Sequence, residues 1–402
     1  MSTSVDVVIA GGGPVGAFAA LCLRNTALAV VHVDSGKPGT ERPIALSHGS
    51  RLLLAECDVF DRIANTPIRT IHVSQRGAFG RAVMTAEEFG LPALGYVADY
   101  GGIRSAMSET VAPHSGLVTG WAATSDGVDV QVCDRDGLTG VIHAGLLVLA
   151  DGTAGAALPD EVPGSADRFV TRDYSQCAIV AQVRTEISHG NRAYERFTPD
   201  GPLALLPNGD GFALVWCVNP AAASGLIEAE DKTFLASLGM CFGLRLGKFV
   251  EVSGRRRFPL SLRFMKNNPD ARVVSIGNAA QSLHPVAGQG LNLGLRDAWE
   301  LAQALLNPEM SIAHPDFAKS FMGHRATDRR MEIGLTDLLA RTFSRFAPPL
   351  GPLRGAALLA IDVLPPVRRL LGNFMLHGSR PNRMAAMETD ARAVREKIVT
   401  LG

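Results

Sequence analysis

A glycine-rich turn near the N-terminus constrains the fold more than any other stretch of the sequence. Residues 5–10 read VDVVIA, an apolar run typical of a strand that is buried on both faces. Gly11, Gly13 and Gly16 follow with the spacing G-x-G-x-x-G, and a helix-compatible stretch begins directly after them. A second apolar run then ends at Asp34. Strand, turn, helix and strand within about 30 residues form one parallel crossover unit, which predicts an α/β fold.

This unit predicts a site for the phosphates of a dinucleotide. In chain order, its three glycines permit a tight turn, let the backbone approach a pyrophosphate, and let the helix pack closely on the strand. The helix N-terminus at Pro14 and Val15 adds free N–H groups and a positive dipole end. Asp34 is expected to accept a hydrogen bond from a ribose hydroxyl. The alternative is a turn that only packs, with Asp34 as a solvated residue.

A second glycine cluster lies between residues 275 and 298, which read SIGNAAQSLHPVAGQGLNLGLRDA. The pattern predicts a strand, then a loop that holds His284 and Pro285, then a helix that begins near Leu291. A glycine-lined loop again directs a helix N-terminus at a ligand. A second helix N-terminus of this kind can bind a second electron-rich group on the same cofactor.

This second cluster resembles the second FAD-binding motif of the class A flavoprotein monooxygenases. Its residue pattern is similar to that of the ubiquinone-biosynthesis hydroxylases. The resemblance covers most of the chain and implies FAD as cofactor and NAD(P)H as electron donor. Most relatives in the class have Asp where this chain has Asn278, whereas the quinone subgroup commonly has Asn. On this resemblance the second motif contacts FAD through Asn278, Pro285, Gly288, Gln289, Gly290, Leu291 and Asn292.

Other positions also match motifs of the class. Asp151 and Gly152 resemble the middle motif, which serves FAD and is thought to serve NAD(P)H. This chain has Gly155 where a serine is usual, and it lacks the arginine that commonly follows. Arg42 and Arg104 match basic positions that contact FAD in the class. Ordinary surface arginines are the alternative reading for both.

The resemblance implies an enzyme that hydroxylates the ring of a polyprenyl phenol. Four stretches, 71–80, 195–207, 242–248 and 333–337, are most similar to the subgroup that acts on 2-polyprenyl-6-methoxyphenol. In the implied cycle NAD(P)H reduces FAD, O2 forms a flavin 4a-hydroperoxide, and its distal oxygen attacks the ring. Two alternatives stay open. One is a sister ring hydroxylase with different regiochemistry, and the other is a non-catalytic FAD-containing subunit of a quinone-biosynthesis assembly.

The sequence offers one candidate catalytic side chain. His284 is the only histidine inside a motif, and it can act near the flavin, assist the phenol, or only shape the loop before Pro285. No general base for the phenol is recognisable. The substrate pocket is expected to draw on residues 202–207 and 212–216.

Composition and spacing exclude several other classes. Lys plus Arg and Asp plus Glu are both 39, so the net charge of zero argues against a nucleic-acid partner. None of the 6 cysteines is spaced for a metal or redox pair, so we expect no metal and a reducing compartment. No apolar run approaches the ~18 residues of a membrane span, and no export signal is recognisable. These features predict a cytoplasmic protein.

The strand and helix patterns predict an α/β (α+β) fold whose domains interleave along the chain. We expect a discontinuous Rossmann-like FAD-binding domain of the aromatic-hydroxylase type over residues 1–70, 96–170 and 258–345. A mainly antiparallel sheet domain for substrate is expected over residues 71–95 and 171–257, and a helical C-terminal region over 346–402.

The C-terminal region is basic and amphipathic. Between Arg341 and Arg383 it holds seven arginines and the single acid Asp362, and a proline pair separates two apolar segments. In the second segment Val367, Leu370, Leu371, Phe374 and Met375 form one helical stripe. The region can contact the inner face of an anionic membrane, pack on the catalytic body, or dock on an acidic partner in a biosynthetic assembly.

Overall fold

The structure is a computed structural model. It describes residues 3–37, 42–77, 79–152, 168–266, 270–284, 288–342 and 351–378. Pro285 and the arginines after residue 378 lie outside the described residues. Within the described part, no helix is long and apolar enough to cross a membrane.

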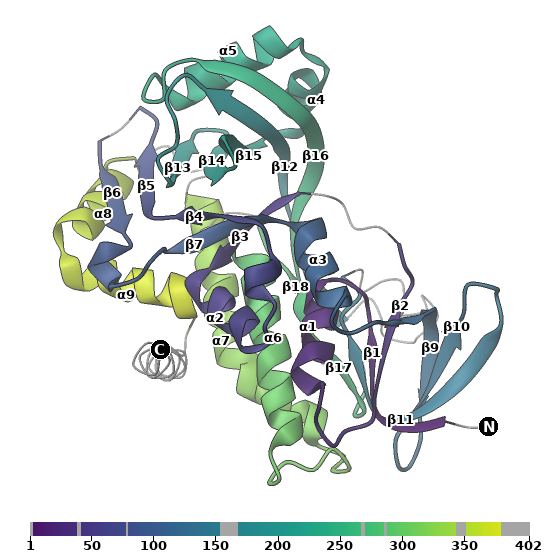
Figure 1. The fold of residues 1–402 in the computed structure, drawn as a ribbon. Coiled ribbons are helices and arrows are strands. Elements are labelled where there is room, and N and C mark those ends of the chain that lie inside the picture. Colours follow the sequence, from purple (N-terminus) through teal and green to yellow (C-terminus); the bar gives the residue numbers. More distant parts are fainter. Residues whose placement is uncertain are drawn as a thin grey trace, which may run out of the picture.

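The N-terminal crossover unit forms the centre of a mixed sheet (Figure 1). The strand order is β8-β2-β1-β11-β10-β9, β17 pairs with β11, and the contacts of β1 with β2 and β11 are parallel. The strands β9, β10 and β11 form an antiparallel meander, and the 11-residue β11 ends in a buried apolar stretch. The elements are β1 (Thr3–Ala10), α1 (Pro14–Leu23), β2 (Val30–Asp34), β8 (His114–Ser115), β9 (Leu117–Ala123), β10 (Val128–Cys133), β11 (Thr139–Leu149) and β17 (Val273–Ser275).

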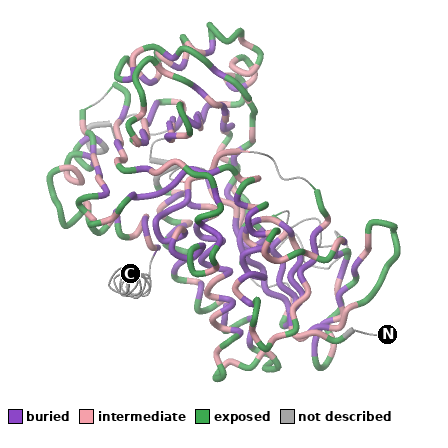
Figure 2. Tube along the Cα trace, in the orientation of Figure 1, coloured by how far each residue is buried: buried purple, intermediate pink, exposed green. Residues whose placement is uncertain are grey.

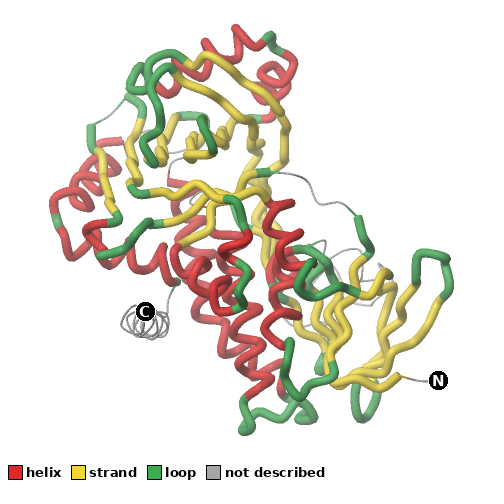
Figure 3. The backbone as a smooth tube through the Cα atoms, in the orientation of Figure 1, coloured by secondary structure: helices red, strands yellow, loops and turns green. Residues whose placement is uncertain are grey.

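An eight-stranded sheet makes up the second layer, and its strand order is β18-β16-β12-β15-β14-β13-β5-β6. Two helices, α4 (Pro220–Glu228) and α5 (Asp231–Phe242), cover one of its faces (Figures 1 and 3). The sequence pattern predicts mainly strands over this stretch, so these two helices were not expected. The strands are β5 (Thr70–Gln75), β6 (Arg81–Thr85), β12 (Phe169–Thr185), β13 (Arg192–Thr198), β14 (Gly201–Asn208), β15 (Gly211–Val218), β16 (Phe249–Met265) and β18 (Gln281–Ser282).

A small antiparallel sheet and a group of helices connect these layers. The sheet has the order β3-β7-β4. Its strands and the accompanying helices are β3 (Pro43–Ser47), α2 (His48–Glu56), β4 (Asn65–Ile68), β7 (Gly95–Asp99), α3 (Tyr100–Ser108), α6 (Gln289–Leu306) and α7 (Phe317–Thr342). The division of the chain into domains stays a proposal, because β12 and β16 run as single long strands between the layers.

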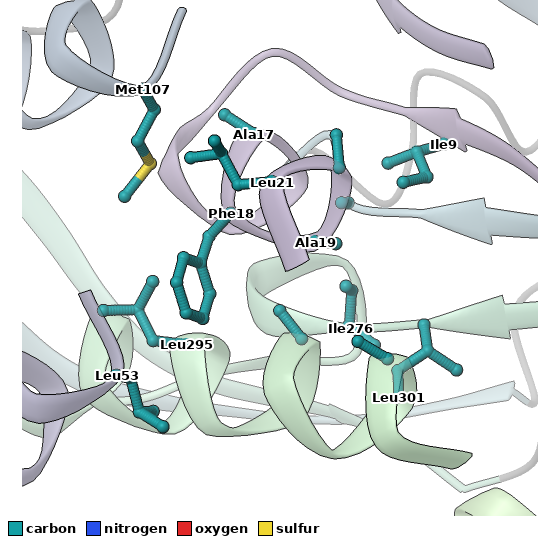
Figure 4. Packing of buried hydrophobic residues seen from close by; sticks show 14 of the residues in the cluster. Ile9, Ala17, Phe18, Ala19, Leu21, Leu53, Met107, Ile276, Leu295 and Leu301 are labelled. Atoms are coloured by element: carbon teal, nitrogen blue, oxygen red, sulfur yellow. The ribbon is translucent and has the colours of Figure 1, made fainter. Parts of the chain in front are cut away.

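The largest hydrophobic core lies where α1 and α6 pack against each other (Figures 2 and 4). Phe18 of α1 and Leu295 of α6 are both fully buried there. A Cβ built on Gly277 or Gly294 would approach the Val15 side chain to 3.0 and 2.7 Å. The second glycine cluster therefore packs directly on the helix that follows the first glycine turn.

The C-terminal helices α8 (Gly351–Val363) and α9 (Pro365–His377) pack on the body of the protein. The Val83 amide of β6 donates to Asp362 at 3.0 Å, and Arg368 pairs with Glu88 at 3.0 Å. Pro365 and Pro366 open α9, as the proline pair predicts. The described C-terminal residues thus follow the packing alternative, although part of their apolar surface remains exposed.

Candidate active site

One large cavity lies between the eight-stranded sheet, the two glycine loops and the C-terminal helices. Its volume is about 830 Å³. Most of its wall is apolar, and the sheet, α7, α8 and α9 all contribute to it. The predicted site residues that line it are Gly13, Pro14, Val15, Arg42, Asp151, Gly152, Asn278, His284, Gly288, Gly290 and Leu291.

The first turn uses its glycines for two different purposes. Gly11 has φ +129°, and a Cβ there would lie 2.6 Å from the carbonyl carbon of Ala150. A Cβ on Gly16 would lie 2.0 Å from the Gly11 oxygen. Gly13 has an ordinary φ of −74°, and its Cβ would meet only the Tyr100 hydroxyl, at 3.1 Å. The fold therefore requires Gly11 and Gly16, whereas Gly13 leaves the uncapped N-terminus of α1 open to the cavity.

Asp34 and Arg104 form an ion pair behind this turn. Arg104 donates to the Asp34 carboxylate at 2.7 Å, and the Gly36 amide donates to it at 3.0 Å. Neither Asp34 nor Arg104 lines the cavity. Asp34 and Arg104 were predicted as two separate cofactor contacts, but in the structure their side chains pair with each other. A carboxylate has about four lone-pair sites, so Asp34 retains capacity for a ribose hydroxyl.

Arg42 does line the cavity, and its partner was not predictable from the sequence. Its guanidinium carbon lies 5.3 Å from the centre of the Tyr100 ring, within range of a cation–π contact. Tyr100 also faces Gly13 and was not predicted as a site residue. Only the three-dimensional contact between α3 and the first turn reveals it.

The second loop places the N-terminus of α6 at the cavity. Gly288 is its N-cap, with φ +61° and no side-chain cap, so the first N–H groups stay available. The Asn292 side chain points away and forms four hydrogen bonds, accepting from Ser47 N and Ser50 Oγ and donating to the carbonyls of Ala45 and Gly288. Gln289 is buried and reaches the Met375 carbonyl at 3.5 Å. These two side chains fix the loop.

A buried ionic network behind the second loop was not predicted. The Asp297 carboxylate accepts from Arg325 Nε at 2.9 Å, from Gln281 Nε2 at 2.7 Å and from Gly277 N at 3.3 Å. Asp297 is fully buried and Arg325 is 1% exposed. Asp297 therefore fixes the turn that presents Asn278 to the cavity.

His284 lies in the cavity wall and is 1% exposed. Its ring stands edge-on to the Tyr174 ring at 5.1 Å, and Nε2 lies 3.4 Å from Gln176 Oε1. Burial lowers the pKa of His284 to about 4, so its imidazole is neutral at neutral pH. This geometry suits a loop-shaping role as well as a catalytic one, and the catalytic role stays a proposal.

These residues fit FAD. Two helices, α1 and α6, direct uncapped N-termini toward one cavity, and each first turn carries no acidic residue. Such termini bind phosphates and stabilise negative charge. Fold and site together define a flavoprotein of the aromatic-hydroxylase class.

Comparison with known proteins identifies the family. The family described as "FAD binding domain" matches residues 109–327. Ubiquinone hydroxylase UbiL of Rhodospirillum rubrum is 31% identical over 92% of this chain and 89% of its own. The 3-demethoxyubiquinol 3-hydroxylase of Escherichia coli is 29% identical over 89% of this chain and 94% of its own. The chain therefore belongs to the ubiquinone-hydroxylase family of FAD-binding monooxygenases.

A solved structure supports the fold. The p-nitrophenol 4-monooxygenase PnpA of Pseudomonas putida DLL-E4 superposes with a TM-score of 0.71 at 20% identity, over 94% of this chain and 100% of that one. The α/β aromatic-hydroxylase fold is thus confirmed, and the protein is an FAD-dependent monooxygenase.

Proposed function

We propose that this enzyme hydroxylates the ring of 2-polyprenyl-6-methoxyphenol, para to its hydroxyl, in ubiquinone biosynthesis, with O2 and NAD(P)H as co-substrates. The observation that carries the proposal is a cavity in which both glycine loops face an apolar sheet wall. A flavin held at the loops would thereby face an aromatic ring held against the sheet. The names of the curated relatives support the pathway.

The residues of this chain would position the cofactor and exclude water. FAD, when bound, supplies the redox chemistry and the activation of O2. The N–H groups at Gly290 and Leu291 would donate to the electron-rich edge of the flavin ring and stabilise negative charge there. Phe258, Leu260 and the neighbouring sheet residues would keep water from the reacting ring.

The isoprenoid tail would lie among the helices. Leu335 and Leu338 of α7, Leu358 of α8, and Leu371 and Met375 of α9 line the same cavity. Leu338 is also 61% exposed, which places it at an opening. An apolar path from the ring site to the surface suits a long hydrocarbon chain.

The corner between α8 and α9 would contact a membrane surface. Five apolar side chains there are at least 41% exposed, and Arg369 beside them is exposed as well. Scattered exposed apolar residues are ordinary, but a group on one corner marks an interaction surface. Docking on a partner in a quinone-biosynthesis assembly is the alternative. The five residues are Leu359, Val363, Leu364, Val367 and Leu370.

The relatives do not agree on which ring carbon is hydroxylated. One of them is named for hydroxylation at a different ring carbon. Complementation tests the regiochemistry directly. Bacterial strains that each lack one of the three ring hydroxylases of the pathway would receive this gene, and quinone intermediates would be identified by mass. Rescue of the strain that accumulates 2-polyprenylphenols with a 6-methoxy group is expected. Rescue of another strain alone would overturn the regiochemistry.

A further inference from the structure

One carboxyl group stands in the apolar wall that the eight-stranded sheet contributes to the cavity. Glu195 of β13 pairs with Val73 of β5 on one side and with Ala204 of β14 on the other. The same row continues through Val215 of β15 to Val180 of β12. All five side chains line the cavity, because residues in register across a sheet share one face. Glu195 is thus the single polar side chain among these five cavity-lining residues.

Among the described residues, no hydrogen bond or ion pair engages the Glu195 carboxylate, and its Oε1 atom is buried. Burial raises the pKa of Glu195 to about 7. An acceptor buried without a donor is unfavourable in a folded protein, so its presence in a ligand cavity suggests that a ligand supplies the donor.

The surroundings define which ligand would fit. The neighbouring wall is hydrocarbon, so the ligand needs an apolar body with one hydroxyl donor aimed at the sheet. A phenol that carries a prenyl chain has this pattern. We propose that Glu195 accepts a hydrogen bond from the phenolic hydroxyl of the substrate and takes up its proton during turnover. This inference rests on the proposed function and names the general base that the sequence did not reveal.

The proton transfer fits the stoichiometry of the reaction. When the O–H bond of the phenol breaks, its electron pair enters the ring and the proton moves to Glu195. The para carbon then forms a bond to one oxygen atom of O2, while the other oxygen leaves as water with two electrons supplied by NAD(P)H. Loss of the proton from that carbon restores the aromatic ring, and Glu195 returns its proton to the ring oxygen, which readies the carboxylate for the next turnover.

Other titratable groups lie around the cavity, but none of them sets the pKa of Glu195. Burial is the only cause of its raised pKa, so no neighbouring charge sets it. The Cys217 thiol lies close by, and burial raises the pKa of this thiol, so it stays protonated. The remaining titratable groups that line the cavity are Arg42, Tyr100, Asp151, Tyr194 and His284.

The test measures phenol recognition by the FAD-loaded enzyme. Flavin absorption would report the affinities for a short-tailed 2-prenyl-6-methoxyphenol and for its O-methyl ether, which lacks the donor, at about pH 6 and pH 8.5. The wild-type enzyme is expected to prefer the phenol roughly tenfold or more at high pH, the value of a charge-assisted hydrogen bond. The preference should shrink at low pH, where Glu195 is protonated.

Three variants separate the role of Glu195 from folding. Glu195→Ala should bring the phenol-to-ether ratio close to one at both pH values. Glu195→Gln keeps the size of the side chain and should retain a small preference without pH dependence. Glu251→Gln is the control, since Glu251 lies in an exposed pair with Arg184 and should behave as wild type. Unchanged FAD content would show that each variant folds.

The outcomes distinguish this inference from the proposed function. A preference that persists with its pH dependence in Glu195→Gln, or no preference in the wild type, overturns the role of Glu195. Product analysis runs in parallel. A wild-type enzyme that prefers the phenol through Glu195 but forms no hydroxylated product would support the binding role and overturn the proposed reaction.

Discussion

At the residue scale, the three glycines of the first turn are not equivalent. A Cβ on Gly16 would overlap the Gly11 carbonyl oxygen at 2.0 Å, whereas a Cβ on Gly13 meets only the Tyr100 hydroxyl. The spacing of the motif predicted all three, but it could not separate the glycines that the fold needs from the one that a ligand needs.

This difference predicts opposite defects for two alanine variants. Gly16→Ala should lower the free energy of unfolding by roughly 1–3 kcal/mol, because the helix must shift. Gly13→Ala should fold normally but weaken FAD binding at least tenfold, since its methyl group occupies the space of the pyrophosphate. Urea unfolding and FAD titration measure the two effects. Gly102→Ala is the control, because nothing lies within 4 Å of a Cβ there. Full FAD affinity in Gly13→Ala would show that the phosphate site is elsewhere.

The buried His284 predicts a pH dependence of stability. Its folded pKa of about 4 lies below the ordinary value of 6.5, so between these values the unfolded chain binds more protons. The free energy of unfolding should therefore fall as the pH drops, by on the order of 2 kcal/mol between pH 7 and pH 5 for this one group. His284→Gln should remove that share. Urea unfolding at both pH values tests it, and equal pH slopes in variant and wild type would contradict it.

Some contacts at this scale were beyond sequence reasoning. Arg104 and Asp34 are 70 residues apart, and no local pattern indicates that they pair. The same holds for Tyr100 opposite Gly13. Glu195 was closer to prediction, because the 195–207 stretch had been singled out and strand alternation places Ala193, Glu195 and Phe197 on one face. The sequence could not show that this face of β13 lines the same cavity as the two glycine loops.

At the element scale, a buried ion pair between Asp297 of α6 and Arg325 of α7 holds α6 in position. Asp297 connects the 277–281 turn to Arg325 of α7, and both side chains are almost inaccessible to solvent. Arg325 also pairs with Asp328 at 2.6 Å, so the network joins two helices and a loop. Such a network is stable only while every charge keeps a partner.

Removing one charged side chain of this network should destabilise the protein. Asp297→Ala leaves buried Arg325 with one acidic partner fewer and should lower the free energy of unfolding by about 3–5 kcal/mol. FAD affinity should fall as well, because the turn that presents Asn278 loses its anchor. Chemical unfolding and flavin content are the readouts, with Glu309→Ala as an exposed acidic control that stays within about 0.5 kcal/mol of wild type. Wild-type stability in Asp297→Ala would contradict the structural role.

Elements with strong periodicity were predicted, whereas short ones were not. β1, α1, β2 and α6 match the expected stretches closely, because long apolar runs and motif glycines mark them. Helices α4 and α5 have only 9 and 12 residues. Few of their side chains are buried, so their sequences show little helical periodicity.

At the scale of the whole molecule, α9 shows how one helical stripe can serve two surfaces. Leu371 and Met375 line the cavity, while Leu370 is 75% exposed and Val367 is 41% exposed. The 3.6-residue period identified the stripe, but it could not show that α9 lies at an edge between cavity and solvent.

Two neighbouring leucines therefore separate membrane contact from substrate binding. Leu370→Glu should reduce co-sedimentation with anionic vesicles roughly tenfold, the value of burying one leucine side chain, and leave substrate affinity unchanged. Leu371→Glu should instead weaken substrate binding, because it places a carboxylate in the cavity. If the wild-type protein stays in the supernatant at low salt, the membrane contact is wrong and docking on a partner becomes the better account.

The central claim is that FAD and a phenol meet in this one cavity and that oxygen passes between them. The direct measurement supplies heavy-isotope O2 and NAD(P)H to the FAD-loaded enzyme with a short-tailed 2-prenyl-6-methoxyphenol. One product is expected, and it should carry a single heavy oxygen atom para to the original hydroxyl. Oxidation of NAD(P)H that yields only hydrogen peroxide, or a product without the heavy isotope, would contradict it.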